Sequence, residues 1–165
     1  MMRSVLCDEQ AFAELIGEGA LYDYELGERY IVAPAASFEH GKKQSIIIHV
    51  LLNHFVEVSA PANLGVLGEP GQRWYVVPGV VVAPEDTTGG DALLDAVIAV
   101  EICSPREDPA AKLAAYREVM ARTGLHVGEV WYVDGATVSV HPDAAEHGPT
   151  AHPAALAAVE AALRM

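Results

Sequence analysis

Residues 97–103 form an apolar run that is interrupted by a single acid, Glu101. A short apolar run without alternation predicts a strand that is covered on both faces of its sheet. After a Ser-Pro break, Asp108 and Pro109 form a typical N-cap and first position of a helix, and Gly124 is a typical helix end. We therefore predict a buried strand followed by a helix that ends just before this glycine.

Other segments show the apolar periodicity of helices or of strands. Apolar residues at helical spacing predict helices at 9–16, 38–58 and 154–164. Shorter apolar segments between turn residues predict strands at 21–26, 29–33, 64–68, 73–77, 80–83, 127–133 and 136–140. Asp134 and Gly135 form a two-residue turn that is typical of a hairpin. This order of elements predicts an α/β fold with a central mixed β-sheet flanked by helices.

Residues 1–165 contain no internal repeat and no linker, so we expect a single domain. The hydrophobic fraction of 52% indicates a globular chain with a core rather than a disordered one. Cys7 and Cys103 provide no disulfide framework. No apolar run reaches the roughly 18 residues of a membrane span, and the first residues lack the apolar block of a signal peptide. We therefore expect a cytoplasmic protein with no membrane partner.

The charge of the chain bears on its partners. Ten lysines and arginines stand against 23 acids, which gives a net charge of -13. Affinity for nucleic acid comes largely from basic residues that neutralise phosphates, and here they are spread along the chain without a basic run. Tight, non-specific binding of nucleic acid by a monomer is therefore not expected, although net charge does not exclude a local basic cleft.

Glu101 is the first candidate for chemistry, because an acid in such an apolar run is costly to bury unless it is paired. Lys112, early in the following helix, is its candidate partner. A functional site and a structural ion pair between the two are both compatible with the pattern. So is a lysine whose stem packs on the helix surface while its ammonium reaches water.

Cys103 suggests a nucleophile with His40 as its base. However, free cysteines in apolar strands are mostly small core residues, and the pattern favours that interpretation.

Six short motifs follow one another over about residues 22–140. They are Tyr24-Glu25-Leu26, Glu39-His40-Gly41, Val77-Pro78-Gly79-Val80-Val81-Val82, Val100-Glu101-Ile102-Cys103-Ser104-Pro105, Lys112-Leu113 with Tyr116, and Gly128-Glu129-Val130-Trp131-Tyr132-Val133-Asp134. In this order and spacing they resemble the Uma-type family of the PD-(D/E)xK restriction-endonuclease-like superfamily. The resemblance implies a restriction-endonuclease-like core and a Mg²⁺-dependent nuclease ancestry.

The resemblance also implies roles for individual residues. Carboxylates in such a site hold one or two metal ions, which orient water and neutralise the scissile phosphate. By motif, Glu101 is a metal ligand, and Glu39 is the helix acid with His40 beside it. Lys112 is the lysine that stabilises charge or assists the water. It comes from the helix because Cys103 occupies the usual strand position.

One acid of the family pattern is missing, because Gly79 follows Pro78 where the pattern has an aspartate. A glycine has no side chain to bind metal, and Mg²⁺ prefers several oxygen ligands in near-octahedral geometry. Glu85 and Asp86 lie six and seven residues later and substitute only if that loop folds back.

The sequence therefore predicts a divergent nuclease-family protein whose Mg²⁺-dependent phosphodiesterase activity is weak or lost. Two alternatives remain. One is a catalytically inactive binding or assembly module, such as a homodimer. The other is a cleft reused for a small-molecule ligand, with Glu101, His40 and Cys103 as polar groups in an apolar pocket.

Overall fold

The computed structural model describes residues 5–7, 22–26, 30–34, 38–60, 76–87, 95–103 and 108–165, the first three of these segments by their backbone. The predicted helix at 9–16, the predicted strand at 64–68 and most of the predicted strand at 73–77 lie outside these residues.

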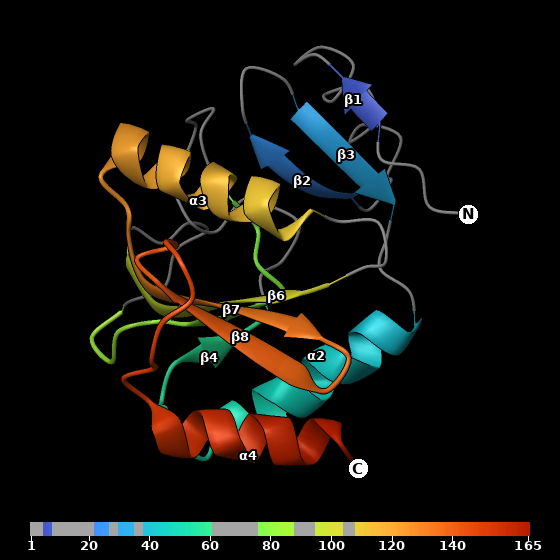
Figure 1. The fold of residues 1–165 in the computed structure, drawn as a ribbon, viewed down its shortest axis with the longest axis vertical. Helices are drawn as coiled ribbons and strands as arrows, with labels where there is room; N and C mark the ends of the chain where they lie inside the picture. Colours follow the sequence, from blue (N-terminus) through green and yellow to red (C-terminus); the bar gives the residue numbers. More distant parts are fainter. Residues whose placement is uncertain are drawn as a thin grey trace.

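Two sheets are present in the described part (Figure 1). The smaller sheet contains β1 (Val5–Cys7), β3 (Tyr30–Pro34) and β2 (Tyr22–Leu26) in that order, and all its pairs are antiparallel. The pairing of β2 with β3 confirms the strand pair predicted at 21–26 and 29–33.

The larger sheet is mixed, as predicted. Its order is β4 (Val58–Ser59), β5 (Val80–Val82), β6 (Asp95–Ile102), β7 (His126–Asp134) and β8 (Thr137–Pro142). β6 and β7 are parallel, and the other neighbours are antiparallel. The hairpin turn lies one residue later than predicted, at Gly135 and Ala136, with Gly135 at a φ of 62°.

Helices cover both faces of the larger sheet (Figure 1). α2 (Phe38–Leu51) and α4 (Pro153–Leu163) pack on one face, against the inward side chains Ile98, Val100 and Ile102 of β6. α3 (Pro109–Thr123) packs on the other face and also contacts β2 of the smaller sheet. The central strand is therefore buried on both sides, as its apolar run predicted.

The bounds of α3 confirm the prediction from its capping residues. The Asp108 side chain accepts a hydrogen bond from the backbone N–H of Ala110 at 3.0 Å, and Pro109 occupies the first turn. Gly124 ends the helix at a φ of 73°, a left-handed conformation that glycine adopts without a steric penalty. Local signals thus fix both ends of α3. The N-terminal signal also fixes the position of Lys112 in the first turn of the helix.

The predicted end of α2 at residue 58 is wrong. The helix ends at Leu51, and Val58 pairs instead with Val82 to form β4. A β-branched residue suits an edge strand, and this tertiary pairing outweighs the continued apolar spacing on which the prediction rested. No helix within the described residues is long and apolar enough to cross a membrane.

Candidate functional site

Glu101 lies near the end of β6 and is 4% exposed. Its strand neighbours Val100 and Ile102 pack toward α2 and α4, while the Glu101 carboxylate contacts side chains of α3. The acid is therefore buried between the sheet and α3, where an unpaired charge would be costly.

Two residues of α3 bind the two oxygens of this carboxylate. The Lys112 ammonium lies 3.3 Å from Oε2, and the Tyr116 hydroxyl donates a hydrogen bond of 2.5 Å to Oε1. The side chain of Lys112 is 13% exposed and that of Glu101 is 6% exposed, so the ion pair is nearly excluded from water. Because Lys112 and Tyr116 are four residues apart, they lie on the same face of the helix.

The structure thus brings Glu101 and Lys112 together as an ion pair. Tyr116 belongs to one of the six sequence motifs, but the sequence pointed to no role for its hydroxyl. Its spacing from Lys112 was the signal that could have identified it. A bond between a phenol and a carboxylate is charge-assisted and stronger than one between neutral groups.

Cys103 follows Glu101 by two residues, so the alternation of the strand, if continued, places it on the same face of the sheet. Its backbone N–H donates to the Val133 carbonyl at 2.7 Å, and the residue is half-buried. Cys103 occupies the strand position at which the resemblance expects a lysine, and the ammonium of the site comes instead from α3.

Gly79 lies just before β5, where its N–H donates to the Val100 carbonyl at 2.8 Å. Its own carbonyl accepts a hydrogen bond of 2.6 Å from the Gln44 side chain of α2. A Cβ at position 79 would lie 3.4 Å from the Val100 oxygen and 3.5 Å from Cδ1 of Ile102. Ile102 packs on the α2 face, opposite Glu101, so a side chain at 79 would begin on the face away from the carboxylate.

Gln44 is a second residue that sequence reasoning missed. It precedes the buried helix residues Ile47 and Leu51 by three and seven positions, so the helical stripe pointed to it. It links α2 to the backbone at Gly79, the position where the resemblance expects an acid.

Glu39 and His40 lie in the first turn of α2, the former exposed and the latter half-buried. Glu85 and Asp86 are exposed in the turn after β5. Within the described residues, no group of three or more histidine, cysteine, aspartate or glutamate side chains could hold a metal ion. These residues alone therefore do not fit a Mg²⁺ site, since they offer Glu101 without the further oxygen ligands that Mg²⁺ requires.

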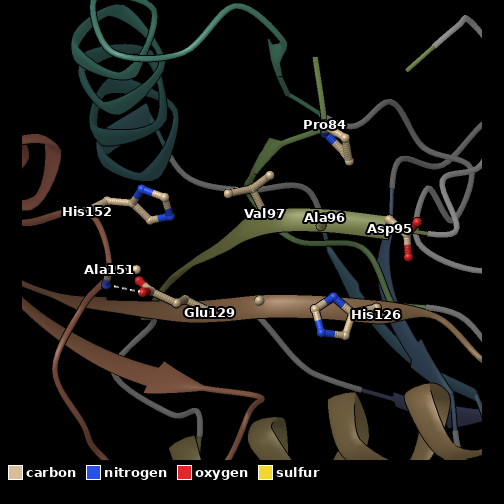
Figure 2. A pocket seen from close by; sticks show the side chains of 9 residues that line it. Pro84, Asp95, Ala96, Val97, His126, Glu129, Ala151 and His152 are labelled. Atoms are coloured by element: carbon tan, nitrogen blue, oxygen red, sulfur yellow. Dashed lines mark hydrogen bonds between the residues drawn. The ribbon is translucent and has the colours of Figure 1, made fainter. Parts of the chain in front are cut away.

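A separate open pocket of about 410 Å³ lies where β6 and β7 begin (Figure 2). Glu129 contributes to its wall, but both carboxylate oxygens already accept hydrogen bonds from Trp131, Thr150 and the Ala151 N–H. This carboxylate fastens the segment before α4 to β7. The pocket's described lining is Pro84, Asp95, Ala96, Val97, His126, Gly128, Glu129, Ala151 and His152.

None of the residues expected in a small-molecule cleft, Glu101, His40 or Cys103, lines this pocket. It begins at the opposite end of β6 from Glu101, roughly 13 Å from it at about 3.3 Å per residue between Val97 and Glu101. The pocket and the Glu101 site are therefore two different places in the fold.

The mixed sheet with helices on both faces is a restriction-endonuclease-like α/β core. Among solved structures, the chain is similar to a protein from Anabaena variabilis described as a "putative nuclease belonging to DUF820". The TM-score is 0.57 at 15% sequence identity, over 86% of this chain and 90% of that chain. At this identity the similarity establishes the fold. No protein-family model matches the sequence. No curated protein matches it either.

Proposed function

We propose that this chain is a divergent protein of the PD-(D/E)xK nuclease lineage, with metal-dependent phosphodiesterase activity that is weak or lost. The observation that carries the proposal is the state of Glu101. Both of its oxygens are bonded by Lys112 and Tyr116, and Gly79 stands where a second strand acid is expected.

The lineage is supported by what the site retains. A strand carboxylate and a lysine lie together in a fold that is similar to the solved structure described as a "putative nuclease". An ammonium in this position can stabilise the charge that develops on a phosphate during cleavage. Lys112 would supply that stabilisation if a phosphodiester reached it.

The charges at Glu101 and Lys112 support the proposal that metal-dependent activity is weak or lost. A divalent cation that binds Glu101 would lie close to the Lys112 ammonium, and two like charges a few ångströms apart repel each other, most strongly where water is excluded. Position 79 has no carboxylate to offset this repulsion, and the described residues contain no group of three or more histidine, cysteine, aspartate or glutamate side chains that could hold the ion. Metal affinity in the millimolar range or weaker follows.

An inactive binding or assembly module is the second candidate, and the same observation supports it. With its charge neutralised by Lys112, Glu101 fastens α3 to β6. On this view the fold is kept for its surface, and a homodimer is one form that an assembly could take.

Metal titration and DNA-cleavage assays distinguish the two candidate functions. Calorimetry with Mg²⁺ and Mn²⁺ should be run on the wild type, on Glu101→Ala and on Asp95→Asn, a matched exposed acid on the same strand. The same proteins should be incubated with single-stranded and double-stranded DNA. Weak binding and cleavage that Glu101→Ala abolishes and Asp95→Asn preserves support the nuclease. If the wild type binds no metal at millimolar concentration and cleaves no DNA, the result supports the binding or assembly module.

A further inference from the structure

Tyr116 is completely buried, and its ring is held by its neighbours on α3 and on the sheet. Leu113 and Val119 flank it on the helix, and Val127 and Val130 of β7 belong to the same buried cluster. Because protein cores are closely packed, a ring that is completely buried among such neighbours is held in one rotamer. Its hydroxyl is therefore a fixed point at the interface between α3 and β6.

The side-chain orientations of Glu101 and Lys112 are not fixed by their ion pair alone. A lysine has a flexible four-carbon stem and an ammonium that can bond in several directions, so it does not by itself fix the orientation of a carboxylate. The hydrogen bond of 2.5 Å from Tyr116 to Oε1 supplies that constraint, because it leaves Oε2 turned toward the ammonium at 3.3 Å.

We propose that Tyr116 is the positioning residue of this site. Its hydroxyl holds Oε1 of Glu101, and the orientation that results presents Oε2 to Lys112. The inference rests on the proposed function for the importance of the pair, since a nuclease-lineage site needs the carboxylate and the ammonium in one defined geometry. It acts through Glu101 and needs no contact with a substrate.

The chain offers a direct measurement, because it contains three lysines, at positions 42, 43 and 112. Lys42 is exposed and Lys43 is half-buried on α2, whereas Lys112 is in the buried pair. In ¹⁵N–¹H spectra of the lysine ammonium groups, an immobilised and shielded ammonium exchanges its protons slowly and gives a signal apart from those of surface lysines. Lys112→Met assigns that signal by removing it.

The test compares Tyr116→Phe with Val119→Ala in the full chain without metal. The first removes only the hydroxyl, and the second removes packing atoms from the same buried face of α3. We expect the distinct Lys112 signal in the wild type and in Val119→Ala. In Tyr116→Phe the proton-exchange rate of the Lys112 ammonium should rise at least tenfold. The Lys112 signal should then merge with the signals of Lys42 and Lys43.

Three results would overturn the inference: a Lys112 signal unchanged in Tyr116→Phe, an equal loss in both variants, or no distinct signal in the wild type. A second measurement needs no change at position 116. The Tyr116 hydroxyl proton should give a downfield resonance in the wild type, and Glu101→Gln should move it upfield, since the acceptor loses its charge. An unmoved resonance counts against the proposal.

Failure of the proposed function has a different signature. If the wild type neither binds metal nor cleaves DNA while Tyr116→Phe still releases Lys112, the nuclease chemistry is lost and the positioning stands. If cleavage is present and insensitive to Tyr116→Phe, the function stands and the positioning role is refuted.

Discussion

Glu101 and Glu129 lie on the neighbouring parallel strands β6 and β7, and their carboxylates face opposite sides of the sheet. They are 4% and 5% exposed. Glu101 is bonded by an ammonium and a phenol on the α3 side. Glu129 accepts from an indole, a hydroxyl and a backbone N–H on the α4 side. Of the two, Glu101 has the charged partner expected of a site, whereas Trp131, Thr150 and the Ala151 N–H are neutral donors that tie Glu129 into the fold.

Glu129→Ala should lower the free energy of unfolding by roughly 2–4 kcal/mol, because it leaves buried donors without an acceptor. Urea denaturation monitored by circular dichroism measures this loss. Glu118→Gln, which alters an exposed pair with Arg122, is the matched control and should leave stability unchanged. The ammonium signal of Lys112 should persist in both variants. A stability close to wild type in Glu129→Ala would show that the segment before α4 is held by other contacts.

Lys112→Met should cost about 3–5 kcal/mol of stability, because it leaves a buried carboxylate without its counter-charge. Combining it with Glu101→Leu should restore much of that loss, since replacing both charges by apolar groups removes the desolvation cost. A double-mutant cycle in urea gives the coupling energy between the two positions. Additive losses would mean that the two side chains are independent in solution.

Gly79→Asp tests the proposal that the lack of an acid at this position limits metal binding. The new Cβ fits, since its nearest contact is 3.4 Å, but it would lie against Ile102 on the face opposite Glu101. We expect a folded variant that is destabilised by roughly 1–3 kcal/mol through the partly buried carboxylate. Its Mn²⁺ affinity by calorimetry should stay within tenfold of wild type. A large gain in affinity with new DNA cleavage would show that this acid was all that had been lost.

Two glycine substitutions should have opposite effects on thermal unfolding. At Gly128 a Cβ would lie 2.7 Å from the Val97 carbonyl, so Gly128→Ala forces β6 and β7 apart and should cost about 1–3 kcal/mol. Gly41 lies within α2 with open space around it, so Gly41→Ala should add about 0.5–1 kcal/mol through helix propensity. Equal effects at the two positions would contradict the close contact between the strands.

Local signals predicted some of these features well. The bounds of α3 follow from Asp108 and Gly124, because capping is decided within one turn. The end of α2 could not be predicted in this way, since it depends on Val58 pairing with a strand more than twenty residues away. Long-range contacts of this kind leave little trace in local apolar spacing.

In the candidate site, too, local sequence signals predicted some residues, while long-range contacts could not be predicted. An acid in the apolar run pointed to Glu101, and motif spacing added Lys112. The spacing of four residues from Lys112 places Tyr116 on the same face of α3, but it does not show that the hydroxyl reaches the carboxylate, so this contact was missed. The helical stripe pointed to Gln44, but its bond to the Gly79 carbonyl could not be predicted, because it depends on how α2 lies across the end of β5.

Glu101, Lys112 and Tyr116 all belong to one strand-helix-strand unit, from Asp95 to Asp134. The bond from Tyr116 to Glu101 spans 15 residues of sequence. Closing so short a loop costs little entropy, so this contact can form early in folding. The smaller sheet contributes none of these three side chains. One contiguous stretch of chain therefore carries the acid, its counter-ion and the hydroxyl that bonds it, so the three side chains can be moved together into another protein as a single segment.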